Sequence, residues 1–132
     1  MNSIKILAIA ISATAMFSTA AFADGDAAKG EKVFKKCAAC HSIEEGKNKV
    51  GPSLHGVIGR ECGAISDFKY SKGYLDACEK GFTIDEAFLD DYLKDPSAKI
   101  SSIAQNKERS KMTFKLKKED DIKAVTEYLK QN

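Results

Sequence analysis

The chain has 132 residues, of which 30% are charged and 43% are hydrophobic, and its formal net charge at pH 7 is +2. Lys5 is the only charged residue among residues 1–23, so the remainder of the chain is close to neutral. This balance argues against a nucleic-acid-binding protein, which would carry a strong basic excess. The length beyond residue 23 suits one small domain, without internal repeats or low-complexity stretches.

Residues 1–23 have the pattern of a cleaved signal peptide. One lysine precedes an apolar run from Ile6 to Phe17, and Ala21-Phe22-Ala23 has the small-x-small form of a cleavage site. The run is short for a membrane span, which needs about 20 residues, and an uncleaved anchor is the alternative. We therefore expect cleavage before Asp24 and a periplasmic mature protein of residues 24–132. That compartment permits disulfides, which bears on the interpretation of the four cysteines.

The first half of the mature chain predicts two helices separated by a long loop. Apolar residues recur at helical spacing from Asp26 to about Cys37, which indicates an amphipathic helix. Residues 42–69 contain too many glycines for a long regular element, and we expect an extended loop there. A short helix is expected over Ser71–Cys78.

The second half predicts two further helices. One begins at Thr83, where Thr83 and Glu86 form a capping box, and it stops at Asp95-Pro96. The polar segment from Ser97 to Lys107 is expected to be a surface loop. The last helix starts at acidic residues 119–121, which suit a helix amino terminus. The prediction is an all-α fold of about four helices, and its long loops need something to wrap around.

A short motif follows the first predicted helix. Cys37-Ala38-Ala39-Cys40-His41 has the C-x-x-C-H pattern of covalent c-type haem attachment. Two thiols three positions apart lie on one face of a helical turn, so both can add to the vinyl groups along one haem edge. His41 is then placed to bind the iron. A backbone carbonyl of the Gly51-Pro52 loop is expected to hold its other ring nitrogen.

Three other interpretations of the cysteines compete with haem attachment. A thioredoxin-type redox pair belongs on a βαβ pattern, which this sequence lacks. A zinc site could use four cysteines, but Cys62 and Cys78 are single and widely spaced. A plain disulfide between Cys37 and Cys40 would leave His41 without a role. Haem attachment is the favoured hypothesis.

Beyond this motif, the mature chain resembles the class I c-type cytochromes, especially the soluble bacterial cytochrome c2 type and its mitochondrial relatives. The likeness is carried by the helix that leads to Cys37, the loop from Lys49 to Arg60, and three later segments: Phe68-Lys69-Tyr70-Ser71, Tyr92-Leu93-Lys94-Asp95-Pro96 and Lys111-Met112-Thr113-Phe114. The resemblance implies the small cytochrome c fold, in which helices and loops wrap around one covalently attached haem. It also implies an electron carrier and not an enzyme.

The resemblance implies the second axial ligand as well. Met112, the only methionine after residue 23, matches the family's axial methionine opposite His41. A thioether ligand favours ferrous iron and raises the redox potential, which suits an electron carrier. An ordinary core methionine is the alternative for Met112. His55 is a rival ligand, although a solvated loop histidine is the favoured interpretation of it.

Further cofactor-binding residues follow from the same likeness. Arg60 and Tyr70 match the residues that donate hydrogen bonds to the haem propionates, which need donors in an apolar crevice. Tyr92 resembles the family's crevice tyrosine near the axial sulfur, with a core aromatic as an equal alternative. Two positions depart from the family pattern, because Ile84 replaces a propionate-bonding Trp and Tyr74 replaces a common Asn.

Cys62 and Cys78 are not generally required by the family. In an exported protein a disulfide between them is favoured over two free thiols. Such a bridge would contribute about 3 kcal/mol in the chain-entropy model.

With both axial positions occupied, the implied function is outer-sphere transfer of one electron through the exposed haem edge. The resemblance implies a monomer that takes electrons from a quinol-cytochrome c oxidoreductase and passes them to a cytochrome oxidase or a photosynthetic reaction centre. Lysines that could ring the edge and meet acidic partners are Lys35, Lys36, Lys49, Lys111, Lys115, Lys117 and Lys118. The alternatives are a haem enzyme or gas sensor with an open sixth position, and a redox domain tethered through uncleaved residues 1–23.

Overall fold

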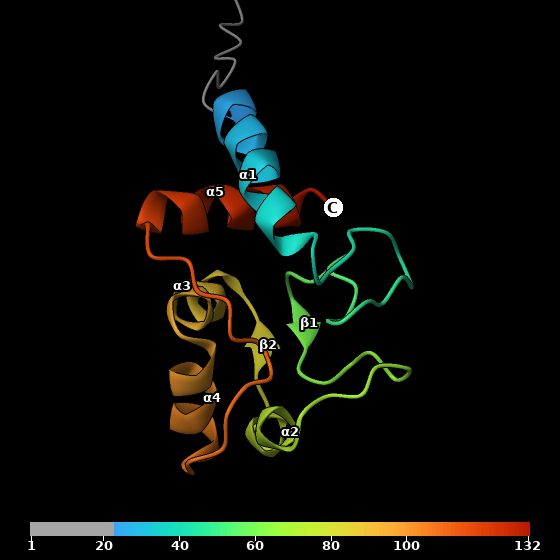
Figure 1. Cartoon of the computed structure of the whole chain (residues 1–132), viewed down its shortest axis with the longest axis vertical. Helices are drawn as coiled ribbons and strands as arrows, with labels where there is room; N and C mark the ends of the chain where they lie inside the picture. Colours follow the sequence, from blue (N-terminus) through green and yellow to red (C-terminus); the bar gives the residue numbers. More distant parts are fainter. Residues whose placement is uncertain (1–22) are drawn as a thin grey trace, which may run out of the picture.

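The computed structural model describes residues 23–132, which form five helices and one pair of short strands (Figure 1). In chain order these elements are α1 (Ala23–Cys37), β1 (Arg60–Glu61), α2 (Lys72–Cys78), β2 (Thr83–Ile84), α3 (Glu86–Lys94), α4 (Pro96–Ala104) and α5 (Glu119–Lys130). This helical architecture confirms the all-α prediction. The signal peptide predicted over residues 1–23 lies outside the described residues except for Ala23. None of the helices in the described part combines the length and apolar character that crossing a membrane requires.

Helices α1 and α5 cross in the upper half of Figure 1 and pack closely against each other. A Cβ atom at Gly30 would meet the backbone carbonyl of Ala124 and would lie 2.6 Å from the Cβ of Tyr128. The rings of Phe34 and Tyr128 pack beside this contact with their centroids 5.2 Å apart. The missing side chain at Gly30 therefore lets α1 lie directly on α5. The apolar core continues from this crossing into α3 through Val33, Leu89, Leu93, Ile122, Val125 and Leu129.

The predicted starts of two helices are correct. Ser71 caps α2 by accepting a hydrogen bond from the backbone N–H of Tyr74 at 3.2 Å. Helix α5 begins at Glu119 with three acidic residues in its first turn, as expected from their attraction to the helix amino terminus.

The capping box predicted at Thr83 and Glu86 is wrong. Thr83 lies in β2, where it pairs with Glu61 of β1, so its backbone is extended and belongs to a strand. Helix α3 starts at Glu86 instead, and its cap is Asp85, whose side chain accepts from the backbone N–H of Phe88 at 2.7 Å. Thr83 and Ile84, which precede α3, therefore pair with residues 60–61 of β1.

The surface loop predicted over Ser97–Lys107 is also wrong, because most of it forms α4. Asp95 ends α3 and caps α4, accepting from the backbone N–H of Ala98 at 3.0 Å. Pro96 stands in the first turn of α4, where a helix needs no backbone donor. Ile100 is fully buried and fixes the helix to the core. One Asp-Pro pair thus stops one helix and starts the next.

Residues 42–69 form the expected long loop, interrupted by β1 at residues 60–61. Cys62 follows β1 directly and forms a disulfide with Cys78, the last residue of α2, with a Cα–Cα distance of 5.2 Å. The predicted disulfide is confirmed. It ties the loop to the end of α2 and confines Tyr70 to a short closed segment.

Candidate functional site

The C-x-x-C-H motif forms a closed turn at the end of α1. The backbone N–H groups of Cys40 and His41 both donate to the carbonyl of Cys37, at 3.0 Å and 2.9 Å. Cys37 and Cys40 are free thiols, and burial raises the pKa of the Cys37 thiol to about 11. A thiol with such a pKa is not a poised thiolate, which argues against a thioredoxin-type redox pair. The zinc interpretation also fails, because Cys62 and Cys78 are bonded to each other.

His41 is held by the loop that follows the motif. Its Nδ1 lies 2.8 Å from the carbonyl oxygen of Pro52, which confirms the predicted contact with the Gly51-Pro52 loop. A Cβ at Gly51 would meet the His41 imidazole, so the loop backbone lies flat against the ring. Burial lowers the pKa of His41, against the opposing effect of the Pro52 hydrogen bond. The imidazole is therefore neutral at pH 7, with Nδ1–H donating to Pro52 and Nε2 left available.

Met112 lies in the segment between α4 and α5 and packs, half-buried, against the core. Its backbone N–H donates to the hydroxyl of Ser110 at 3.1 Å. That hydroxyl also lies 3.0 Å from the hydroxyl of Tyr92, a residue of α3. Burial raises the pKa of Tyr92, so its phenol stays protonated at neutral pH. The fold thus brings Met112, Ser110 and Tyr92 together from two elements, whereas His55 is exposed.

Arg60 lies in β1, within the long loop, and Tyr70 directly follows that loop. The Arg60 guanidinium donates to the carbonyl of Ser53 at 2.8 Å and to that of His55. The Tyr70 hydroxyl accepts from the backbone N–H of Ile65 at 3.2 Å, so its own proton can still be donated. Burial lowers the pKa of Arg60, and the nearby phenols of Tyr70 and Tyr74 act in the opposite direction.

Comparison with known proteins identifies the family. Residues 27–77 match the family model described as cytochrome c. The chain is 49% identical over 120 residues to cytochrome c2 of Rhodospirillum rubrum, covering 89% of both chains. It is 47% identical over 107 residues to cytochrome c-550 of Novispirillum itersonii, covering 80% of this chain and 96% of that protein. The chain belongs to the cytochrome c family, as a class I, cytochrome c2-like member.

The solved structures agree with this assignment. Cytochrome c2 from Rhodospirillum centenum superimposes with a TM-score of 0.75 at 43% identity, covering 81% of this chain and 98% of that chain. Cytochrome c2 from Paracoccus denitrificans gives a TM-score of 0.74 at 40% identity, covering 80% and 94%. The small cytochrome c fold expected from the sequence is confirmed.

Membership of this family makes the protein an electron carrier and not an enzyme. Its cofactor is haem c, attached covalently through the C-x-x-C-H motif. The residues present fit that group, because two unbridged thiols stand three positions apart on one turn. The neutral His41 imidazole, with Nε2 available beside them, is the form that binds iron.

Tyr74 departs from the family pattern in sequence, and in the structure it connects two parts of the site. Its ring stacks on Tyr70 with centroids 5.1 Å apart and meets Tyr92 edge-on at 6.5 Å. It therefore joins the Arg60 and Tyr70 side of the site to the Tyr92 and Met112 side. Burial raises the pKa of its phenol. The four-residue spacing of Tyr70 and Tyr74, at the start of a helix, is the sequence signal that predicts their stacking.

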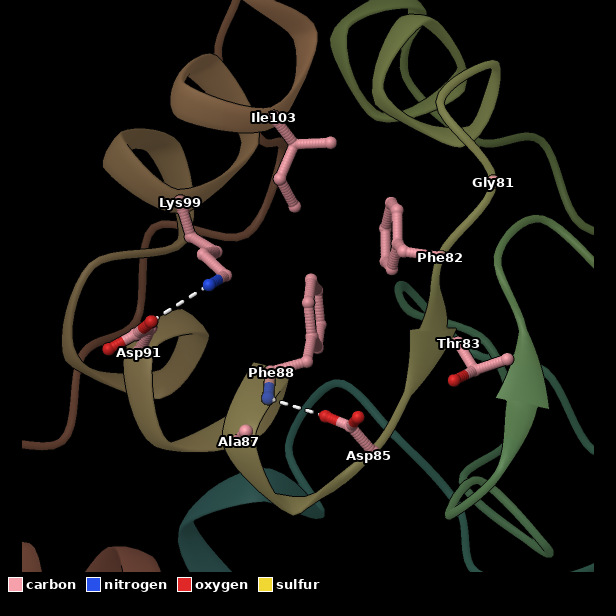
Figure 2. A pocket seen from close by; sticks show the side chains of 9 residues that line it. All are labelled: Gly81, Phe82, Thr83, Asp85, Ala87, Phe88, Asp91, Lys99 and Ile103. Carbon is pink, nitrogen blue, oxygen red and sulfur yellow. Dashed lines mark hydrogen bonds and ion pairs between the residues drawn. The ribbon is translucent and has the colours of Figure 1, made fainter.

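A separate pocket of about 430 Å³ opens between β2, α3 and α4 (Figure 2). The side chains of Phe82, Phe88 and Ile103 point into it, and Lys99 pairs with Asp91 at its rim at 2.8 Å. None of the predicted haem-binding residues lines this pocket.

Proposed function

We propose that this cytochrome is a soluble periplasmic carrier that transfers one electron at a time, with His41 and Met112 as axial ligands of the haem iron. The bound haem supplies the one-electron redox couple, and the chain holds, orients and shields it. The observation that carries the proposal is the anchoring of the Met112 segment, whose backbone N–H donates to Ser110 at 3.1 Å. A methionine held in this way keeps the sixth position closed and stabilises the ferrous state.

Cys37 and Cys40 are proposed to form the two thioethers, and His41 to bind the iron through Nε2. The support is the closed turn that holds the two free cysteines three positions apart and the fixed tautomer of His41, whose Nδ1 is 2.8 Å from the Pro52 carbonyl. A hydrogen bond at the far nitrogen also makes the imidazole a better ligand.

Arg60 and Tyr70 are proposed to donate to the propionates, and Tyr92 to lie near the axial sulfur. A guanidinium has five N–H donors, and the contacts of Arg60 with Ser53 and His55 leave donors for a carboxylate. The Tyr70 hydroxyl accepts from Ile65 and can donate in return. Tyr92 is tied to the Met112 segment through Ser110.

Residues 1–23 are proposed to be a signal peptide cleaved before Asp24, which leaves the single haem domain of residues 24–132. The apolar run before Ala23 and the similarity to relatives named cytochrome c2 support export to the periplasm. Amino-terminal sequencing of the exported protein should give Asp24 as the first residue. An intact Met1 would instead indicate a tethered redox domain.

The proposed partners are large redox complexes with acidic docking surfaces. A quinol-cytochrome c oxidoreductase would be the donor, and a cytochrome oxidase or a photosynthetic reaction centre the acceptor. Two of the seven candidate lysines are paired with carboxylates, Lys36 with Asp121 at 3.8 Å and Lys115 with Asp95 at 2.6 Å. Within the described residues the other five form no ion pair: Lys35, Lys49, Lys111, Lys117 and Lys118. The interface between a carrier and such a partner buries little area and binds weakly, which permits fast turnover by a monomeric carrier.

The decisive test is the substitution Met112→Ala. The native ferric protein should show the weak near-infrared charge-transfer band of a methionine-ligated low-spin haem. The variant should lose that band, bind cyanide or carbon monoxide and have a lower redox potential, because the soft ligand is gone. Native protein that lacks the band and binds carbon monoxide at neutral pH would favour the gas-sensor or haem-enzyme alternative.

A further inference from the structure

The segment between Pro96 and Met112 is folded against another part of the chain. Helix α4 packs on α2 (Figure 1) and ends at Ala104, and Gln105 then takes a left-handed conformation with φ of 56°. The chain turns back at this point and runs towards Met112. The turn therefore decides where the Met112 segment begins.

Asn106 connects this turn to α2. Its side-chain nitrogen donates to the carboxylate of Asp76 at 3.2 Å, across 30 positions of sequence. Its side-chain oxygen accepts from the backbone N–H of Glu108 at 2.9 Å. The hydroxyl of Ser101 in α4 donates to the carbonyl of Glu108 at 2.6 Å. One amide thus fixes the turn internally and fastens it to α2.

Gly73 places the backbone of α2 against the residues that follow the turn. A Cβ atom at Gly73 would lie 2.8 Å from the Cβ of Glu108 and 2.9 Å from the carbonyl oxygen of Arg109. Arg109 is three residues before Met112, and Ser110 between them holds the Met112 backbone. A displacement of this backbone would be transmitted directly to the Met112 segment.

Helix α2 is itself anchored at its opposite end. Cys78 is bonded to Cys62 at the end of β1, and the Cys62 N–H donates to the carbonyl of Phe82 at 3.0 Å. The buried Ala77 packs into the core between these contacts. The helix is therefore a fixed support and not a mobile flap.

We propose that α2 acts as a brace for the axial ligand, in which Asn106 and Gly73 are positioning residues that keep the Met112 segment closed over the haem. This inference rests on the proposed function, since it concerns the ligand assigned there. The brace slows the opening of the segment that must precede replacement of the Met112 sulfur. It also gives a role to the turn between α4 and Met112.

The test measures the rate at which ferric holoprotein binds cyanide at saturating cyanide and neutral pH, where opening of the Met112 segment limits binding. Asn106→Ala removes a hydrogen bond to a charged acceptor and should raise this rate about tenfold. Lys72→Ala is the matched control, because it removes the other partner of the same carboxylate, Lys72 Nζ to Asp76 at 2.6 Å, without touching the turn. The control rate should stay within about twofold of the native rate.

Gly73→Ala provides a second variant, whose added methyl group displaces Glu108 and Arg109 and should also accelerate cyanide binding. The native near-infrared band is recorded first, because its absence would overturn the proposed ligation and this inference together. If the band is present and neither variant accelerates cyanide binding beyond the Lys72→Ala control, the inference alone is overturned. Acceleration in both variants, with urea unfolding midpoints close to that of the control, supports the brace.

Discussion

A single buried hydroxyl organises the contacts of the Met112 segment. Ser110 Oγ lies 3.0 Å from the Tyr92 hydroxyl and 3.1 Å from the backbone nitrogen of Met112. Since both contacts use the same oxygen in a buried setting, their energies should be coupled and not independent. The coupling can be measured by removing the two hydroxyls singly and together.

Ser110→Ala leaves the Met112 N–H without its acceptor and the Tyr92 hydroxyl without its hydrogen-bond partner. We expect the free energy of unfolding to fall by about 1–3 kcal/mol, the usual effect of orphaned buried polar groups. Adding Tyr92→Phe to this variant removes the unpartnered hydroxyl and should recover part of the loss. Urea titration of the four proteins checks this, and strictly additive effects would show that the two hydroxyls do not interact.

The sequence predicted the residue contacts that lie close along the chain better than those made across the fold. The contact of His41 with the Gly51-Pro52 loop follows from a motif and the segment just after it. Tyr74 stacks on Tyr70, four residues earlier, but its edge-on contact with Tyr92 of α3 depends on where α2 lies in the fold. A contact that depends on where a whole helix lies has no local signal in the sequence.

Among the helices, the crossing of α1 and α5 has the clearest requirement at a single position. Gly30→Ala would normally stabilise a helix by about 0.5–1 kcal/mol, because alanine restricts the unfolded chain. At this crossing the new methyl group meets the backbone of Ala124, which cannot move aside as a side chain could. We therefore expect a net destabilisation of about 1–3 kcal/mol in urea unfolding. Lys32→Ala, at an exposed position of the same helix, is the control, and a stabilised Gly30→Ala protein would contradict the close crossing.

Helix α4 shows why element boundaries were harder to predict than the fold class. After a helical pattern Pro96 predicts a helix end, but a proline in the first turn is equally a start signal. Ile100, Ile103 and Ala104 have helical spacing, yet they stand among polar residues that made the segment look like a loop. At Thr83 the capping pattern was outweighed by pairing with Glu61, a partner far away in sequence. Long-range pairing decided the case of Thr83, whereas the start of α4 has a local signal in the Asp95-Pro96 pair.

At the scale of the whole molecule, the distribution of charge matters more than its near-zero sum. Ion pairs join α3 to its neighbouring helices, including Lys99 with Asp91 at 2.8 Å and Lys130 with Glu86 at 2.8 Å, so these lysines are locally neutralised. Lys111 is exposed and lies beside Met112, and among the residues that the structure describes its ammonium donates only to the carbonyl of Lys69, at 3.4 Å. Its field should act on a charged reagent within a Debye length of ~8 Å at physiological salt.

Lys111→Glu should therefore slow oxidation of the ferrous protein by hexacyanoferrate(III), an anionic oxidant. We expect a rate lower by roughly tenfold at low salt and a weaker dependence on ionic strength, because local steering is lost. Lys80→Glu, in the turn after α2, changes the net charge by the same amount and serves as the control. Stopped-flow kinetics of both variants checks this. Equal effects would mean that overall charge, and not a docking face near Met112, governs the encounter.

The disulfide between Cys62 and Cys78 also sets a condition on how the protein matures. Under the proposed export, four reduced cysteines enter an oxidising compartment, where one pair must be oxidised and the other must remain as thiols. A Cys37–Cys40 or mixed pairing would block thioether formation, because a sulfur in a disulfide cannot add to a vinyl group. Expression strains that cannot reduce misplaced disulfides in this compartment should therefore accumulate this chain as colourless, haem-free protein.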